Sequence, residues 1–413
     1  MATTLQGLRC KECGREYPLE AHYFCADCFG PLEVAYDYGD LDAAEVRRRI
    51  QAGSDGIWRY ADFLPFESRP AAALEPGLTP LIRADRLAER IGVGEVWIKN
   101  DAANPTHSFK DRVVAVALAK AIELGFDTIA CASTGNLANA VAAHAAAAGI
   151  ESFVFVPTDL EEQKLLATSV YGTTLVGVDG AYDDVNRLCT QLAEERGWAF
   201  VNVNLRPYYA EGSKTLAYET AEQLGWRLPD RIVCPIASGS LFTKIGRGFT
   251  EWLDLGLIEG ELPAFHGAQA AGCGPVAAAY AAGHETCRPV RADTIAKSLA
   301  IGTPADGPYA LDLARSTGGS VEAVSDDEIR AGIRLLAETT GIFTETAGGV
   351  TTATLAKLAT SGELGRDDRV VVYITGEGLK TLDAVREGFA MHRIEPTLES
   401  FADAVAERPT ALA

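Results

Sequence analysis

One lysine lies in a turn-forming stretch directly before an alanine-rich helical pattern: Lys110, within "NPTHSFKDR" (residues 104–112). The helix macrodipole disfavours a cation in the first turn of a helix, and partial burial also disfavours a charged amine. A neutral amine at such a place is a nucleophile suited to Schiff-base chemistry. Exposed lysines are common in first turns, so Lys110 alone does not distinguish a catalytic amine from a surface charge.

Three more polar turns follow expected strands, which is where ligands bind in open α/β sheets. The turn "STGN" (133–136) offers hydroxyl, amide and helix N–H groups to a carboxylate or phenolate oxygen, although simple helix capping also explains it. The turn "ASGSL" (237–241) lets backbone amides approach a phosphate and matches no nucleotide signature. The turn "TGEGL" (375–379) permits close backbone approach to a flat ligand.

Two Cys-x-x-Cys pairs, Cys10 with Cys13 and Cys25 with Cys28, are separated by eleven residues. Two such pairs have the spacing that closes a tetrahedral zinc site. A ribbon that folds without metal and a redox pair are the alternatives, and the redox reading lacks the strand–CxxC–helix pattern. Acidic residues outnumber basic ones in residues 9–33, which favours a docking or capping role over nucleic-acid binding.

The stretches between the turns alternate between two patterns. Short β-branched runs are typical of buried strands: "EVWIKN", "TIACAS", "SFVFVP", "TTLVGV", "RIVCPIAS" and "RVVVYIT". Amphipathic or alanine-rich helical patterns separate these runs. This alternation predicts a doubly wound α/β protein. Residues 40–90, rich in proline near their end, are expected to be irregular connecting chain, and residues 391–413 a surface helix with a frayed tail.

Composition limits the classes of function. The 413 residues are 47% hydrophobic and 23% charged, an ordinary globular composition, and no apolar run is long enough to span a membrane. A net charge of −20 argues against an extended nucleic-acid surface. The N-terminus lacks the apolar core of a secretory signal, and the remaining five cysteines are scattered in apolar segments. We therefore expect a cytoplasmic protein with reduced thiols.

The four turns, in this order, resemble those of the fold-type II pyridoxal-phosphate (PLP) enzymes, the tryptophan synthase β-like family. The resemblance covers nearly the whole chain and is carried by "EPGLTPL", "NPTHSFKDR", "STGN", "GAYDDV", "AEGSKTLAYETAEQLGW", "IASGSLFTKIGRGF" and "FTETAGGVTTATLAKL". It implies two doubly wound open-sheet domains with an N-terminal zinc-ribbon-like unit built on the four cysteines. The implied bounds are 1–36 for this four-cysteine unit, 37–111 with 209–413 for the large PLP-binding domain, and 112–208 for a small mobile domain.

The resemblance also implies roles in cofactor binding. Lys110 would hold PLP through a Schiff base, with Phe109 and Asp111 packing around and orienting it. Asn136 would hydrogen-bond the phenolic oxygen of the ring, and Thr375 would face the pyridine nitrogen. The cofactor phosphate would lie against Ala237, Ser238, Gly239, Ser240 and Leu241.

For the substrate, the resemblance implies that Ser133, Thr134 and Gly135 bind an α-carboxylate. A phosphorylated amino acid also needs cations near its leaving group. The candidates are Arg112, Arg206 and Lys214, followed by Lys244 and Lys297.

The implied reaction converts O-phospho-L-homoserine and water to L-threonine and phosphate, with the Lys110 amine moving protons, in a homodimer. Three positions depart from the family pattern. His107 stands where the motif usually has glycine, Tyr209 where many members have arginine, and residues 237–241 lack the usual asparagine. Replacement by another nucleophile such as sulfite, or elimination from a hydroxy-amino acid, therefore stays open.

Overall fold

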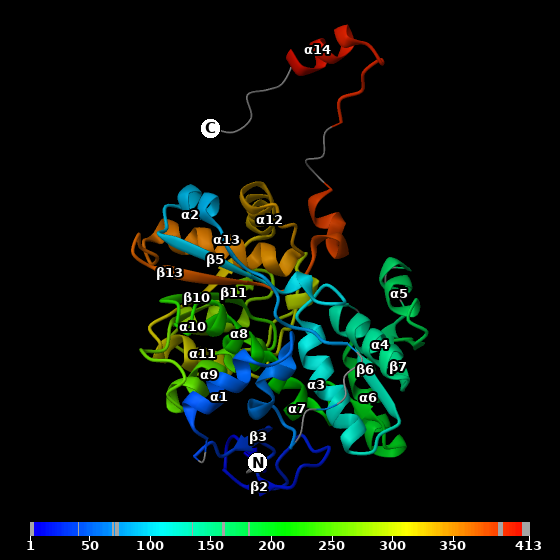
Figure 1. Cartoon of the computed structure of the whole chain (residues 1–413). Helices are drawn as coiled ribbons and strands as arrows, with labels where there is room; N and C mark the ends of the chain where they lie inside the picture. The colour runs from blue at the N-terminus through cyan, green and yellow to red at the C-terminus, as the bar shows by residue number, and fades with distance from the viewer. Residues whose placement is uncertain are drawn as a thin grey trace.

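The computed structural model describes residues 4–39, 41–67, 70, 74–133, 135–158, 162–180, 182–386 and 391–406. Within these ranges the chain forms one small antiparallel sheet and two larger, mainly parallel sheets. Figure 1 shows the N-terminal sheet at the bottom, the six-stranded sheet to the left and the four-stranded sheet to the right. The chain enters the six-stranded sheet, leaves it for the four-stranded sheet, and then returns.

The six-stranded sheet is buried on both faces. Its strands are, in spatial order, β12 (Val321–Val324), β11 (Ala264–Ala270), β10 (Arg231–Pro235), β13 (Arg369–Ile374), β5 (Glu95–Asn100) and β4 (Leu81–Arg83). All neighbours are parallel except β4, which runs antiparallel to β5. Alternate residues of β13 enter different cores, Val371 one and Val370 with Val372 the other, because helices cover both faces.

Two groups of helices cover the two faces of the six-stranded sheet. One face packs against α8 (Thr215–Gln223), α9 (Ser240–Asp254), α10 (Pro275–Ala281) and α11 (Gly307–Ser316). The other face packs against α2 (Asp85–Ile91), α12 (Asp326–Thr340) and α13 (Thr346–Ser361). Local sequence fixes the ends of α12: Ser325 and Glu328 form a capping box, and Gly341 ends the helix in the left-handed conformation.

The four-stranded sheet is entirely parallel. Its order is β8 (Thr174–Val178), β7 (Glu151–Pro157), β6 (Thr128–Ala132) and β9 (Ala199–Phe200). The helices α3 (Lys110–Glu123) and α4 (Asn136–Ala148) cover one face, and α6 (Tyr182–Arg196) covers the other. The helix α5 (Glu162–Ser169) lies beside α4. A short helix, α7 (Arg206–Glu211), and the 3-10 turn η3 (Gly212–Lys214) lead back to α8.

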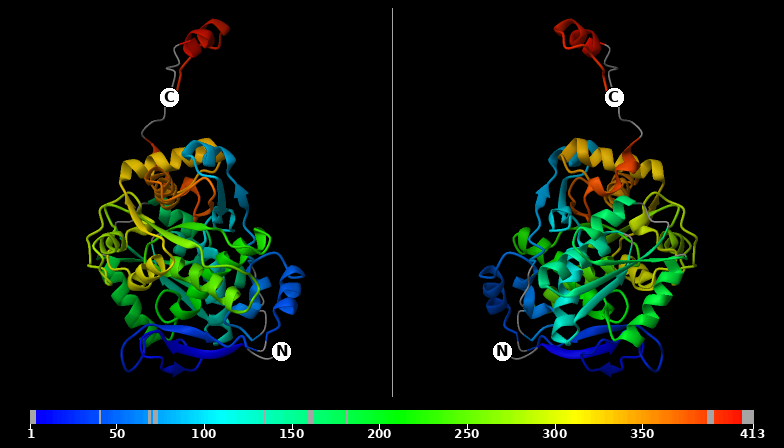
Figure 2. Two further views of the ribbon diagram at one scale, coloured as in Figure 1. Left: turned by 90° about the vertical axis from the view of Figure 1, so that its left-hand side faces the viewer. Right: turned by 90° about the vertical axis from the view of Figure 1, so that its right-hand side faces the viewer.

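The N-terminal sheet consists of β1 (Leu5–Cys10) between β2 (Glu16–Tyr17) and β3 (Leu32–Tyr36). Its buried side chains Leu8 and Val34 belong to the same apolar cluster as Val113 of α3 and Tyr208 of α7. Figure 2 shows this sheet lying along the lower side of the body in both views. The four-cysteine unit is therefore packed onto the helices that surround the lysine turn.

The strand predictions are confirmed at β5, β6, β7, β8, β10 and β13, and the doubly wound architecture is as expected. Each sheet falls within one of the three expected segments. Residues 40–90 are not only connecting chain, because they contain α1 (Ala43–Gln51), the 3-10 helix η1 (Ile57–Phe63), β4 and α2. Around the prolines, the described residues between η1 and β4 form neither helix nor strand, as expected. In Figure 1, α14 (Leu398–Ala406) stands apart from the sheets. Across the described ranges, no helix combines the length and apolarity needed to cross a membrane.

Candidate active site

Lys110 is the first residue of α3 and is half-buried. The backbone N–H of Phe109 donates to the carbonyl of Thr375 at 3.0 Å, and Ser108 forms a bridge with Gly376. These contacts place the lysine turn against the carboxyl end of β13. The Lys110 amine donates a hydrogen bond to the hydroxyl of Tyr209 at 2.7 Å. The structure thus brings two of the four predicted turns together at the lysine.

The backbone conformation of His107 explains why the family motif usually has glycine at this position. Its φ of 61° lies in the left-handed region that β-carbons disfavour. Two backbone hydrogen bonds hold this conformation: the N–H of His107 donates to Asn104 at 2.8 Å, and the N–H of Glu377 donates to the carbonyl of His107 at 3.2 Å. The side chain is exposed. The residue therefore tolerates a turn that glycine would adopt without strain.

Asn136, the first residue of α4, is held by two side chains from the far end of the chain. Its amide nitrogen donates to both carboxylate oxygens of Glu345 at 3.0 Å. Its amide oxygen accepts from Lys380 at 2.7 Å, and Lys380 also donates to the carbonyl of Thr106 at 2.6 Å. Burial raises the pKa of Glu345 and lowers the pKa of Lys380. This cluster joins the four-stranded sheet to the six-stranded one beside the lysine turn.

Sequence reasoning missed both Glu345 and Lys380. The stretch "FTETAGG" contributes to the family resemblance, and the turn "TGEGL" ends one residue before Lys380. Neither pattern singles out Glu345 or Lys380 as a site residue. Glu345 precedes the first residue of α13, and Lys380 lies in the 3-10 helix η5 (Gly378–Val385).

The turn at 237–241 has the geometry of an anion site. Gly239 has a φ of 99°, and a β-carbon there would lie 2.8 Å from the carbonyl oxygen of Asp306. The helix α9 begins at Ser240 with no side-chain cap, so its first N–H groups lack helical partners. Small residues, a left-handed glycine and N–H groups at a helix start suit a phosphate. The N–H of Ser240 donates to the hydroxyl of Ser238 at 3.4 Å in this structure. Ala237, Ser238, Ser240 and Leu241 are each half-buried there.

Two further features fit a flat, polar cofactor beside the lysine. The hydroxyls of Ser108 and Thr346 are buried and lack a hydrogen-bond partner within the described residues. A β-carbon on Gly376 would collide with the carboxylate of Glu345, so the chain there has no room for any side chain. Thr375 is buried at the end of β13. A bound PLP ring would give the unpaired hydroxyls a hydrogen-bond partner. It would also lie close to backbone that carries no side chain.

The substrate residues are only partly brought together. Ser133 and Gly135 are half-buried in the same turn as Asn136, while Thr134 lies outside the described residues. Arg206 pairs with Asp306 at 2.7 Å and with the hydroxyl of Tyr23. Lys244 pairs with Glu211 at 2.6 Å, and Lys297 is exposed in η4 (Lys297–Leu299).

The side chains of Arg112 and Lys214 are already paired with carboxylates inside the protein, which disfavours them as partners of a substrate phosphate. Arg112 is fully buried and donates to Asp101 at 2.6 Å and Glu219 at 2.5 Å, with Thr79 and Thr215 as further acceptors. Lys214 is also fully buried and pairs with Glu211 and Glu251. Because these donors are satisfied inside the protein, both residues hold helices in place behind the lysine.

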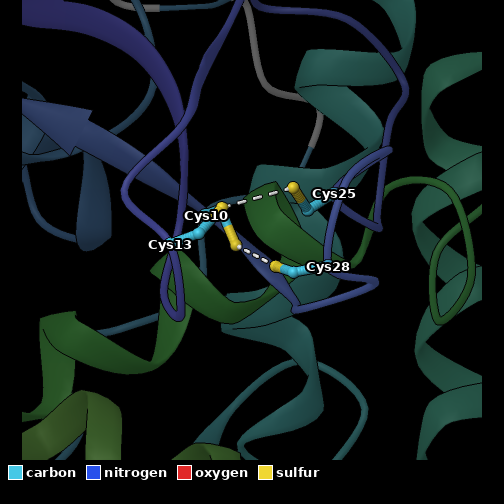
Figure 3. A group of neighbouring side chains, drawn as sticks. All are labelled: Cys10, Cys13, Cys25 and Cys28. Carbon is cyan, nitrogen blue, oxygen red and sulfur yellow. Dashed lines mark hydrogen bonds between the residues drawn. The ribbon is translucent and has the colours of Figure 1, made fainter.

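The four N-terminal cysteines converge on one point (Figure 3). The sulfurs of Cys10 and Cys28 are 3.4 Å apart, those of Cys13 and Cys25 are 3.5 Å apart, and all four lie within 4.8 Å of one another. Zinc–sulfur bonds of about 2.3 Å in a tetrahedron require sulfur separations of about 3.8 Å. The four thiols therefore fit a tetrahedral zinc ion.

The chain is similar to known proteins along most of its length. A family model described as pyridoxal-phosphate dependent enzyme matches residues 72–376. The threonine synthase of Methanocaldococcus jannaschii is 38% identical over 380 residues, 91% of this chain and 93% of that one. The threonine synthase of Methanosarcina acetivorans is 39% identical over 376 residues, 90% and 92% of the two chains. That of Mycobacterium tuberculosis strain H37Rv is 35% identical over 334 residues, 79% and 89%.

Solved structures show the same fold at lower identity. Threonine deaminase isoform 2 from Solanum lycopersicum superposes with a TM-score of 0.63 at 19% identity, covering 88% of this chain and 87% of that one. Maize serine racemase gives a TM-score of 0.61 at 20% identity, covering 73% and 89%. At these identities the likeness concerns the fold alone.

Proposed function

The chain belongs to the pyridoxal-phosphate-dependent enzymes and, within them, to the threonine synthases, and we propose that it converts O-phospho-L-homoserine and water to L-threonine and phosphate. The observation that carries the proposal is the meeting of the turns at Lys110. Phe109 is bonded to Thr375, and Asn136, from the other sheet, is bonded to Glu345. Contacts from distant parts of the chain to the lysine turn support the proposal.

Several residues would hold PLP, which when bound supplies an electron sink for carbanion chemistry. Lys110 would attach it, Asn136 would hydrogen-bond the phenolic oxygen, and Phe109 would pack beside it. The hydroxyl of Thr375, unlike a carboxylate, would not enforce protonation of the pyridine nitrogen. The backbone amides of residues 237–241 would receive the phosphate group.

The chain's own groups would do three further things. The Lys110 amine, released by the substrate amine, would carry protons to and from the substrate carbons. Ser133, Thr134 and Gly135 would bind the α-carboxylate. Among the predicted cations, Arg206 remains a candidate for the substrate phosphate, because it is half-buried and forms a single ion pair within the described residues. The segment 112–208 would close over the site and exclude water.

The proposal also includes a zinc ion held by Cys10, Cys13, Cys25 and Cys28, a homodimer and a cytoplasmic location. The sulfur geometry supports the first of these. The homodimer and the location follow from the family resemblance and from the composition.

The test is an incubation of the purified enzyme with O-phospho-L-homoserine, with phosphate and threonine measured together. We expect equal amounts of both products, and borohydride reduction should fix PLP on the peptide containing Lys110. Lys110→Ala should lose at least about a thousandfold in kcat, while Lys357→Ala, which removes an exposed lysine paired with Glu322, should retain wild-type activity. Phosphate without threonine would favour the elimination or other-nucleophile reactions, and a PLP adduct elsewhere would overturn the assignment of Lys110.

A further inference from the structure

Lys110 differs from several other lysines in its hydrogen-bond partner. Within the described residues its amine bonds only to the phenol of Tyr209, at 2.7 Å, and forms no ion pair. Three other lysines bond directly to carboxylates at 2.6–2.7 Å, Lys99 to Glu219 and both Lys214 and Lys244 to Glu211, whereas Lys380 bonds to Asn136 and to the carbonyl of Thr106. The amine also lies 4.5 Å from the ring centre of Phe109 and 5.4 Å from that of Tyr209. A hydrogen bond to a phenol fixes the position of the amine without forming an ion pair.

Tyr209 is itself held firmly, because contacts on both sides fix the short helix α7. The hydroxyl of Tyr208 donates to the carbonyl of Glu20 at 2.8 Å. Glu211, almost fully buried, accepts from the hydroxyl of Tyr36 at 2.8 Å and pairs with Lys214 and Lys244. The ring of Tyr209 packs in the same apolar cluster as Phe109. The phenol oxygen therefore occupies a defined position opposite the lysine.

We propose that Tyr209 positions the amine of Lys110, holding it at a fixed place beside the cofactor site whenever the amine is free. A phenol oxygen can accept a hydrogen bond from the ammonium form and donate one to the neutral amine, so it holds both forms in place. The bond from the charged ammonium is the stronger of the two, so the phenol favours that form. Tyr209 neither gains nor loses a proton in this role. The inference rests on the proposed function, since it assumes that PLP bonds to Lys110.

Two charged groups lie near Lys110, and the effect of the phenol has to be separated from theirs. Glu345, at the start of α13, is the carboxylate whose charge interacts with Lys110, and it is bonded to Asn136 rather than to the lysine. Lys380 lies beyond it, bonded to Asn136 and Thr106. Removing the phenol oxygen changes neither of these groups directly. Among the described residues, it removes the acceptor that stabilises the ammonium form of Lys110.

The test uses Tyr209→Phe, which deletes the oxygen and keeps the ring. PLP is added to cofactor-free enzyme across a range of pH, adduct formation is followed by absorbance, and the adduct is located by borohydride reduction and mass spectrometry. The midpoint of the pH dependence should move to lower pH by about one unit, because the ammonium form loses its acceptor. The kcat for the substrate should fall by about tenfold with little change in KM.

Tyr208→Phe is the matched control. It removes a phenol oxygen from the neighbouring position of the same helix, and with it the bond to Glu20, but leaves Lys110 untouched. Its pH midpoint should equal that of the wild type, while its Tm should fall. Equal midpoints for Tyr209→Phe and the wild type, with PLP on Lys110 in both, would overturn the role of Tyr209. Absence of PLP from Lys110 in the wild type would instead overturn the proposed function.

Discussion

Asn136 and Glu345 hydrogen-bond to each other at 3.0 Å although 209 positions separate them in the chain. The asparagine begins α4, which covers one face of the four-stranded sheet, and the glutamate precedes a helix that packs on the six-stranded sheet. The pair therefore spans the boundary between the two sheets at the place where PLP would lie. A change in the position of one sheet relative to the other would strain this contact.

Replacing Asn136 by alanine should weaken PLP binding by about 10–100-fold, measured as the dissociation constant from an absorbance titration. The variant loses the predicted contact to the ring and leaves buried Glu345 and Lys380 without their shared partner. Asn139→Ala, one turn later on the same helix and bonded to Thr168 at 2.7 Å, should bind PLP as the wild type does. Equal affinities for the Asn136 and Asn139 variants would contradict the assignment.

His107→Gly should raise stability by up to about 1 kcal/mol, seen as an increase in Tm of about 1–2 °C, because glycine adopts the left-handed backbone without strain. The kcat/KM should be unchanged, since the imidazole is exposed and has no hydrogen-bond partner in the described part of the chain. His107→Ala removes the imidazole but keeps the strained backbone, so its Tm should not rise. A loss of activity in both variants would show that the imidazole takes part in the reaction.

Acid should weaken the buried charge network behind the lysine turn. Burial alone would raise the pKa of Glu219, but the charges of Arg112 and Lys99 outweigh burial and hold it at about 2. The folded pKa is below the unfolded value, so the stabilisation is complete above about pH 5 and is lost as pH falls from about 4.5 towards 2. The shift corresponds to about 3 kcal/mol.

Denaturant unfolding of the wild type and of Glu219→Gln over about pH 2.5–6 measures this effect. The variant should be less stable at about pH 6 by about 3–5 kcal/mol, because two buried cations lose their carboxylate, and its stability should vary less with pH. Glu16→Gln changes an exposed pair with Arg9 and should follow the wild-type curve. Parallel curves for Glu219→Gln and the wild type would refute the argument.

Metal analysis of the purified protein should find about one zinc per chain. Cys13→Ser and Cys28→Ser should each lose the metal and lower the Tm, because binding to a preformed tetrahedral site contributes to folding. The four-cysteine unit packs on α7, so the loss of zinc should also shift the pH dependence of adduct formation at Lys110. Cys287→Ser, a half-buried thiol outside the cluster, should keep the zinc. Full zinc content in the Cys13 variant would exclude this site.

Sequence patterns predicted the β-branched strands because apolar runs of that kind are rarely anything but buried strands. They missed β11, whose sequence "AFHGAQA" has no β-branched residue and is strand only because it pairs with neighbours on both sides. Glu345 and Lys380 were missed because tertiary structure alone brings them to Asn136. Arg112 was a candidate for the substrate only because a phosphate needs cations, and the sequence does not show that Asp101 and Glu219 surround it in the core.

The central position of β13 has a consequence for how the enzyme is made. Lys380 bonds to the carbonyl of Thr106, which precedes it by 274 positions, and β13 pairs with β5 from the first hundred residues. A ribosome adding about 5–20 residues per second needs roughly 14–55 seconds to cover that interval. Throughout this time the nascent chain carries the lysine turn without the strand end that completes it. Cofactor loading therefore comes after nearly all of the chain has been synthesised, and a truncated product would carry Lys110 without a site in which to use it.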